Sequence, residues 1–163
     1  MPATEEKLAV LARIGTMFDA AGICWAVGGS LMLYLRGITD VFHDIDLMVA
    51  EADALRAKEL LLRLGALAPP HPAGQYQTRH FYEFTVDGVE IDLIAGFVIT
   101  AGGTAQECPL LPADIDGSIA VGGAVIPLHA LAVWRRYYML MGRTEKVAMI
   151  DGAAASPKER SHR

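Results

Sequence analysis

The sequence predicts an α+β (α/β) fold in a single domain, and three observations indicate this class. Apolar residues recur at helical spacing in some segments and alternate with polar residues in others. Asp87-Gly88 stands between two strand-like segments, which is a strong signal for an antiparallel hairpin. The chain has 163 residues, 53% of them hydrophobic, which is enough for one substantial core. We expect the domain to cover residues 1–152 and residues 153–163 to form a disordered tail.

The first half of the chain predicts helices separated by short strands. Residues 4–20 carry apolar side chains at helical spacing, and Thr4 is placed to cap that helix. Gly37 suits the end of a second helix, and Gly65 the end of a third, in which Leu55 is expected to pack inward. The expected helices are 4–20, 30–36 and 51–64, and the expected strands are 23–27 and 45–49.

The second half predicts two hairpins and two helices. Residues 100–117 are rich in glycine and proline and are expected to form a loop. Gly122-Gly123 is the expected turn of the second hairpin. The expected strands are 78–86, 89–97, 118–121 and 124–126, and the expected helices are 127–141 and 144–150. One apolar face of the longer helix is expected to lie in the core, namely Leu131, Trp134, Tyr138 and Met141.

Composition and charge argue against several classes of protein. A net charge of −5 and a pI of about 5.5 disfavour a general nucleic-acid-binding surface, although a local basic patch could still bind one nucleotide or tRNA. No apolar run approaches the ~20 residues of a membrane span, and the first residues lack the order of a secretory signal. Cys24 and Cys108 are too few for a disulfide framework, and we expect Cys24 to be buried in a strand. The expected location is the cytoplasm.

Three aspartates stand at strand positions where negative charge would be costly. Asp44 and Asp46 alternate with apolar residues, so both point to one face of a strand, with Cβ atoms roughly 6–7 Å apart. Asp92 lies in the middle of an apolar run, and Glu90 is a weaker candidate on the same face. A divalent cation such as Mg²⁺ takes carboxylate oxygens and would offset the repulsion. The alternative is a solvated strand face.

Gly28-Gly29-Ser30 lies between a predicted strand and a predicted helix. Glycine lets a backbone approach a phosphate closely, a helix N-terminus favours anions, and Ser30 can hydrogen-bond a phosphate oxygen. We therefore assign Gly28, Gly29 and Ser30 to a nucleotide site. The simpler alternatives are a tight turn for the glycines and a helix N-cap for Ser30.

Other polar residues are further candidates for the same site. Arg79 and His80 precede the hairpin strand, where their side chains could meet a triphosphate or lie exposed on the surface. His43 stands beside the aspartates, where a neutral loop histidine is the simpler assignment. Tyr76 and Tyr82 could touch a base, although packing is the more common role of such tyrosines.

Gly-Gly-Ser, then Asp-x-Asp, then a lone Asp between apolar residues resembles the nucleotidyltransferase superfamily over residues 22–150. The resemblance is to the minimal type, which includes abortive-infection-like toxins and aminoglycoside or lincosamide nucleotidyltransferases. It implies a mixed twisted sheet with helices mainly on one face, followed by C-terminal helices. It also implies that Asp44, Asp46 and Asp92 are catalytic and hold two Mg²⁺ (or Mn²⁺) ions, with Asp92 placed to accept a proton.

The same resemblance points to Lys146. Related proteins carry an Arg-x-Lys-Asp-like run on a helix after the sheet, and its lysine reaches the triphosphate. The run here is Arg143-Thr-Glu-Lys-Val147, so an arginine and a lysine match whereas a valine replaces the usual acid. A nucleotide-binding role for Lys146 is implied, and a solvated helix lysine is the alternative.

The implied function is Mg²⁺-dependent transfer of a nucleoside monophosphate from a nucleoside triphosphate, such as ATP, to a hydroxyl acceptor with release of pyrophosphate. The sequence leaves three classes of acceptor open: a small molecule such as an antibiotic, a protein side chain, or an RNA end. It also leaves open whether the biological role is in a toxin–antitoxin system or in resistance. Because the chain has little room for a second substrate domain, a homodimer is expected to complete the site. The alternatives are an inactive nucleotide-binding or interaction module of the same fold and a metal-dependent phosphohydrolase of another fold.

Overall fold

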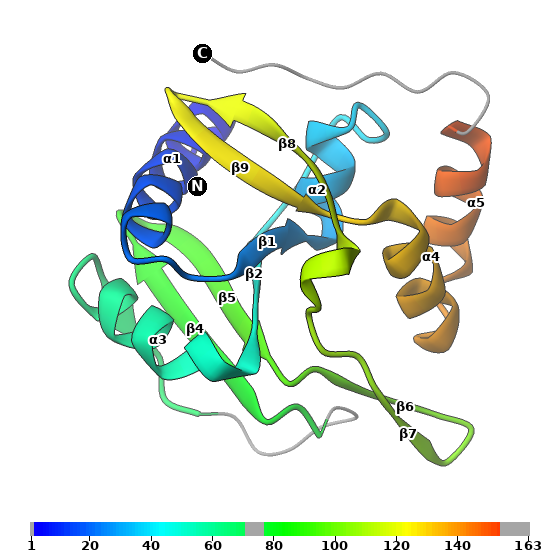
Figure 1. Ribbon diagram of the computed structural model, residues 1–163. Helices are drawn as coiled ribbons and strands as arrows, with labels where there is room; N and C mark the ends of the chain where they lie inside the picture. The colour runs from blue at the N-terminus through cyan, green and yellow to red at the C-terminus, as the bar shows by residue number, and fades with distance from the viewer. Residues whose placement is uncertain (1, 71–76, 154–163) are drawn as a thin grey trace.

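The computed structural model describes residues 2–70 and 77–153, and Figure 1 shows how its elements are arranged. The strands are β1 (Trp25–Gly28), β2 (Ile45–Val49), β3 (Ala66–Leu67), β4 (His80–Val86), β5 (Val89–Ala95), β6 (Val98–Ala101), β7 (Thr104–Glu107), β8 (Ile115–Val121) and β9 (Ala124–His129). The α-helices are α1 (Thr4–Ala20), α2 (Gly29–Leu35), α3 (Ala54–Leu62), α4 (Leu131–Leu140) and α5 (Thr144–Ala153). Two short 3₁₀ turns are η1 (Glu51–Asp53) and η2 (Pro112–Asp114). Residues 154–163 of the expected tail lie outside the described residues.

The main sheet of the described chain has seven strands in the order β3-β4-β5-β2-β1-β9-β8. Its pairings are mixed, because β2 runs parallel to β5 and β1 runs parallel to β9, whereas the other pairs are antiparallel. Strands β6 and β7 form a separate two-stranded hairpin. The parallel pairing of β2 with β5 places the Asp-x-Asp segment beside the strand that carries the lone aspartate.

Helices α1 and α3 cover one face of the sheet, and α4 and α5 pack together on its other side (Figure 1). Leu11, Ile14 and Phe18 of α1 are fully buried, as their helical spacing predicts. Phe18 packs edge to face on Trp25 of β1, with ring centroids 5.4 Å apart. The expected mixed sheet with helices mainly on one face and C-terminal helices is confirmed. No helix of the described ranges is both long and apolar enough to cross a membrane.

Several predicted boundaries are confirmed. Strand β2 covers the expected residues 45–49, and α5 begins at the expected Thr144. The β4–β5 turn lies at Asp87 and Gly88, whose φ angles are 49° and 78°. Hairpin turns of this kind need positive φ at both central residues, and aspartate and glycine tolerate that conformation better than other residues do.

Two predictions at helix starts are wrong. Thr4 is the first helical residue of α1, and the N-cap is Ala3. The helix expected over residues 127–141 begins only at Leu131, because β9 continues to His129 alongside β1. Pro127 is tolerated within β9 because it lies opposite Ser118, where the register of β8 shifts.

Three further predictions need correction. The helix expected over residues 51–64 is split into η1 and α3, and Leu55 is 61% exposed rather than packed inward. The expected loop 100–117 contains the β6–β7 hairpin, whose second strand Thr104–Glu107 has no buried residue to mark it as a strand. Cys24 precedes β1 and is only half-buried, and its backbone N–H donates to Asp53 at 2.8 Å.

Candidate functional site

Three residues from neighbouring strands lie in one row across the sheet. Gly28 at the end of β1 is paired with Asp46 on β2, and Asp46 is paired with Asp92 on β5. Paired residues point to the same face of a sheet, so the two carboxylates are neighbours. The alternate residues Ile45 and Leu47 are fully buried on the opposite face. The two carboxylates therefore face away from the core that α1 and α3 cover.

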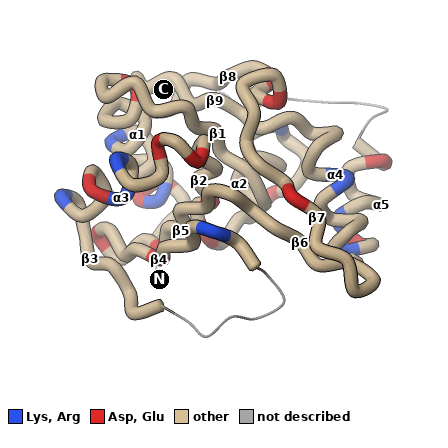
Figure 2. The backbone as a smooth tube through the Cα atoms, turned by 60° about the horizontal axis from the view of Figure 1, so that its bottom comes forward, with Lys and Arg blue, Asp and Glu red and all other residues tan. Residues whose placement is uncertain are grey.

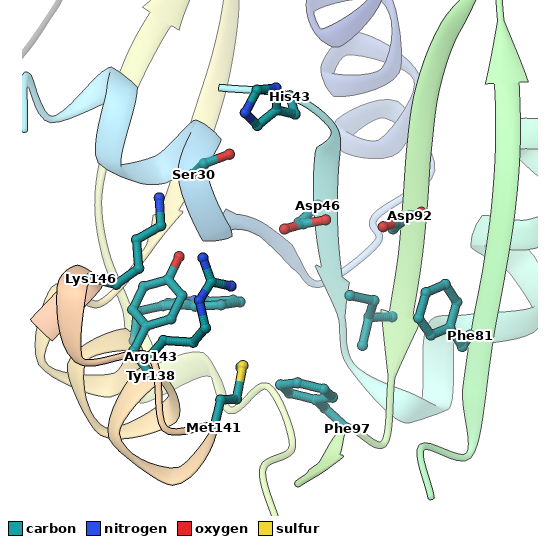
Figure 3. A pocket seen from close by; sticks show the side chains of 12 residues that line it. Ser30, His43, Asp46, Phe81, Asp92, Phe97, Tyr138, Met141, Arg143 and Lys146 are labelled. Carbon is teal, nitrogen blue, oxygen red and sulfur yellow. The ribbon is translucent and has the colours of Figure 1, made fainter. Parts of the chain in front are cut away.

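A pocket of about 270 Å³ opens over these carboxylates (Figure 3). Polar and charged residues form one part of its lining: Ser30, His43, Asp46, Asp92, Arg143 and Lys146. The remainder is apolar or aromatic: Phe81, Ile94, Phe97, Trp134, Tyr138 and Met141. In Figure 3 the cations of the C-terminal helices lie across the pocket from the carboxylates of β2 and β5. Opposite charges thus face each other across a space open to a ligand.

The paired carboxylates perturb each other strongly. Burial, followed by the charges of Asp92 and Asp44, raises the pKa of Asp46 well above its usual value. Burial, followed by the charges of Asp44 and Glu83, raises the pKa of Asp92 to about 7. Direct interaction of the two carboxyls adds to the raised pKa of Asp46 and partly opposes the rise in the pKa of Asp92. The pair therefore holds a proton near neutral pH when nothing else offsets its charge.

Asp44 occupies the bend immediately before β2. It is not among the residues that line the pocket, yet its negative charge contributes to the raised pKa of both Asp46 and Asp92. The structure thus brings the three predicted aspartates within electrostatic range of one another.

The donor chemistry of this cluster fits a divalent cation. Mg²⁺ takes oxygen ligands, and a positive ion between these carboxylates would offset both the burial and the mutual repulsion that raise the pKa values of Asp46 and Asp92. Within residues 2–70 and 77–153, however, no three His, Cys, Asp or Glu side chains are placed closely enough to hold one ion. The two-ion site remains a prediction based on charge and donor type.

The glycines of the Gly-Gly-Ser turn are required by close packing. Gly28 is the N-cap of α2, so Ser30 is not the cap that the simpler alternative proposed. A Cβ at Gly28 would overlap the ring of Trp134, and a Cβ at Gly29 would overlap the carboxylate of Asp46. Gly29 also has a φ of 59°, which favours glycine. Ser30, the next residue, lines the pocket.

The positive charge of the pocket comes from the start of α5. Lys146, which the resemblance assigned to nucleotide binding, lines the pocket, and Arg143 from the preceding turn lines it as well. The Arg143 Nε donates to Glu145 at 2.6 Å, and its guanidinium lies 5.9 Å from the ring centroid of Tyr138. Figure 2 shows Lys and Arg in short separate segments interspersed with acidic residues, so these cations are a local feature rather than part of a large basic face.

Sequence reasoning missed most of the aromatic lining. Trp134, Tyr138 and Met141 were expected in the core, and the first two are indeed buried, but all three also line the pocket. Their spacing on α4 marks one apolar face without telling which part of the sheet that face meets. Trp134 is held by its Nε1–H, which donates to Nδ1 of His129 at 3.0 Å.

Two predicted nucleotide-site candidates lie elsewhere. The guanidinium of Arg79 pairs with Glu51 and Glu107, and Arg79 does not line the pocket. Because these surface carboxylates already pair with its guanidinium, Arg79 is not among the residues to which we assign nucleotide binding below. The Tyr82 hydroxyl hydrogen-bonds His80 at 2.9 Å, and the ammonium of Lys58 lies 4.4 Å from the Tyr82 ring centroid.

The remaining candidates are Glu90, His43 and Tyr76, and one of the two that the structure describes lines the pocket. Glu90 is exposed and does not line the pocket, whereas His43 does line it. Tyr76 lies outside the described residues.

The fold is similar to those of solved nucleotidyltransferases. A candidate nucleotidyltransferase from Thermotoga maritima matches with a TM-score of 0.73 at 22% identity, over 94% of this chain and 96% of that one. The structure of ANT(2'')-Ia in complex with adenylyl-2''-tobramycin matches with a TM-score of 0.62 at 13% identity, over 91% of this chain and 88% of that one. A solution structure of the antibiotic-resistance factor ANT(2'')-Ia matches with a TM-score of 0.56 at 13% identity, over 81% and 70% of the two chains. No protein-family model matches the sequence, and neither does any curated protein.

Proposed function

We propose that this chain, which has the nucleotidyltransferase fold of its structural neighbours, transfers a nucleoside monophosphate from a nucleoside triphosphate to a hydroxyl acceptor. The observation that carries the proposal is the register pairing of Asp46 with Asp92 across a pocket from Lys146. Carboxylates and cations on opposite walls suit a polyphosphate bridged to divalent cations. Two such ions, when bound, would stabilise both the attacking and the leaving oxygen.

We assign a separate role in such a reaction to each group of residues at the pocket. Asp46 and Asp92 in the pocket, with Asp44 immediately before β2, would hold the Mg²⁺ ions, and Ser30 would hydrogen-bond a phosphate oxygen. Lys146 and Arg143 would neutralise the negative charge of the polyphosphate. The hydroxyl oxygen of the acceptor attacks the α-phosphorus, the bond from that phosphorus to the bridging oxygen breaks, and pyrophosphate leaves. The hydroxyl proton passes to the carboxylate of Asp92.

The apolar lining serves the uncharged parts of the substrates. Phe81 is 43% exposed, lines the pocket, and is paired in register with Ile94, two residues beyond Asp92. Phe97 and Met141 continue this surface (Figure 3). The nucleoside or the non-reacting part of the acceptor would bind here. One structural neighbour is complexed with an adenylylated aminoglycoside, which supports a small-molecule hydroxyl as the first acceptor class to test.

Binding of Mg²⁺ and each nucleoside triphosphate to the purified chain tests the first half of the proposal. Ligand at 100 times its Kd stabilises a protein by about 2.7 kcal/mol, which for a domain of this size raises the Tm by roughly 5–10 °C. Asp46→Asn should abolish this metal-dependent rise. Asp87→Asn is the matched control, because Asp87 is a surface aspartate paired with Arg13 and its positive φ suits asparagine.

Transfer itself is tested with triphosphates labelled at the α-phosphate. The chain is incubated with Mg²⁺, the label and mixtures of small hydroxyl compounds, proteins or RNA, and labelled products are separated from free nucleotide. Label appearing on an acceptor with wild-type protein but not with Asp46→Asn supports the transferase. Tight Mg²⁺-nucleotide binding without any transfer would instead favour the inactive module, and binding that is unchanged in Asp46→Asn would contradict the metal assignment.

A further inference from the structure

We infer that the hydroxyl of Tyr138 is a direct ligand of the polyphosphate, which adds a binding residue from α4 to those of the sheet and α5. This inference rests on the proposed function, because it assumes that the pocket accepts a nucleoside triphosphate. Three observations support it: the ring is fixed, the hydroxyl faces the pocket without a hydrogen-bond partner among the described residues, and the charges of Asp46 and Arg143 lie within electrostatic range of it.

The ring of Tyr138 is held rigidly. Only 4% of the residue is exposed. Trp134 packs against it with ring centroids 5.4 Å apart, and the guanidinium of Arg143 lies 5.9 Å from its centroid. Trp134 is in turn fixed by its hydrogen bond to His129 and by close contact with Gly28. A ring fixed on these sides directs its hydroxyl with little loss of side-chain entropy on binding.

The hydroxyl of this ring points into the pocket (Figure 3). A buried tyrosine ordinarily satisfies its hydroxyl with a protein acceptor. Tyr137, the preceding residue, does so by donating to the carbonyl of Cys108 at 3.3 Å. Within residues 2–70 and 77–153, the Tyr138 hydroxyl has no such protein partner. Its donor is therefore available to a molecule in the pocket.

The charges around Tyr138 favour a phosphate group as the acceptor of its hydrogen bond. After burial, the charges of Asp46 and Glu145 raise the pKa of the phenol and that of Arg143 lowers it, so these three charges lie within electrostatic range of the hydroxyl. Burial is the largest cause of its raised pKa, and the group stays a protonated donor at neutral pH. In Figure 3 the Tyr138 hydroxyl lies on the same side of the pocket as Arg143 and Lys146, across from Asp46, so a polyphosphate that reaches from ions at Asp46 to these cations would lie within its reach.

The test uses two conservative variants of adjacent tyrosines, Tyr138→Phe and Tyr137→Phe. Each loses one hydroxyl and keeps its ring. The probes are Mg²⁺-ATP, or whichever Mg²⁺-nucleotide the wild-type chain binds, and Mg²⁺-tripolyphosphate, which has no base or ribose. Calorimetric titration gives the Kd of each probe, and thermal unfolding without ligand gives the Tm.

Tyr138→Phe is expected to raise the Kd of both probes by a similar factor of about ten, because a hydrogen bond to a charged group is lost. Its unliganded Tm should stay at or slightly above that of wild type, because no protein hydrogen bond is lost. Tyr137→Phe should do the reverse, lowering the Tm and leaving both affinities unchanged, because its hydroxyl bonds the protein.

Two outcomes would overturn the inference while leaving the proposed function intact. One is wild-type affinity of Tyr138→Phe for both probes. The other is a loss of affinity for the nucleotide but not for tripolyphosphate, which would place the hydroxyl on the nucleoside. If the wild-type chain binds neither probe, the proposed function fails, and this inference fails with it.

Discussion

Gly29 lies directly against the carboxylate of Asp46, so closely that a Cβ on Gly29 would overlap Oδ2 of the aspartate. The first residue of α2 thus forms one wall around a predicted metal ligand. The Gly-Gly-Ser turn and the Asp-x-Asp strand are adjacent because β1 and β2 pair antiparallel, with Gly28 opposite Asp46. The glycine is needed here both for its positive φ and for the space that the carboxylate occupies.

Gly29→Ala is therefore expected to displace Asp46 and remove metal-dependent nucleotide binding. Gly22→Ala is the matched control, because Gly22 also has a positive φ, 68°, but a Cβ there would meet nothing within 4 Å. The control should lose about 1–2 kcal/mol of stability from backbone strain, with a Tm lower by roughly 2–4 °C per kcal/mol. Gly29→Ala should lose more stability and also the Tm rise with Mg²⁺ and triphosphate. Equal ligand-induced shifts in the two variants would contradict a role for the Gly29–Asp46 contact.

Asp92→Asn is expected to stabilise the metal-free protein at and above neutral pH. The folded-state pKa of Asp92 is raised from 3.8 to about 7, so the folded state binds more protons than the unfolded state between these values. Wild-type stability should therefore fall as pH rises through this window, by at most about 4 kcal/mol at ~1.4 kcal/mol per pH unit. The variant should lose the part of this dependence that comes from Asp92 and keep the part that comes from Asp46, whose pKa burial also raises. Chemical denaturation between pH 4 and 8 in the presence of a chelator measures it, and parallel pH profiles for the two proteins would refute the expectation.

His129 is expected to act on stability in the opposite direction. It is fully buried, and burial lowers its pKa from 6.5 to about 4. Because the unfolded state binds more protons between these values, this contribution is present above pH 6.5 and is lost as the pH falls toward 4. The loss should reach at most about 3 kcal/mol, at ~1.4 kcal/mol per pH unit. His129→Gln should remove that acid sensitivity, so its stability difference from wild type should shrink between pH 7 and pH 4. A difference that does not change with pH would show that His129 does not titrate in this window.

Arg79→Gln and Lys146→Gln should differ in their effect on nucleotide affinity, because Arg79 lies on the surface and Lys146 lines the pocket. Arg79 pairs with two exposed carboxylates, and exposed ion pairs contribute little to stability. Its variant should bind Mg²⁺-nucleotide with wild-type affinity. Lys146→Gln should weaken binding roughly tenfold or more, because a charged hydrogen bond to phosphate is lost. Calorimetric titration of both variants under one salt condition checks this, and an equal loss in the two would restore Arg79 to the site.

The candidate aspartates could be found from the sequence because strand alternation is a local property. Asp46 and Asp92 each stand between apolar residues, and the structure places both on strands beside the pocket. Ser30 follows from the glycine turn before it, and Lys146 from the run that resembles related proteins. The place of Arg79 outside the pocket could not be predicted, because its partners Glu51 and Glu107 come from distant segments that local pattern cannot place beside it.

The sequence by itself therefore determined the type and order of most elements, the β4–β5 turn and the carboxylates, since these depend on residues a few positions apart. Tertiary structure alone decided that Asp46 and Asp92 are register partners and that Tyr138, Trp134 and Arg143 face them. It also decided that residues 127–129 extend a strand, because β1 supplies hydrogen bonds that a helix there would forgo. Pairings of this kind join segments far apart in the chain, and their energy comes from contacts that no local spacing encodes.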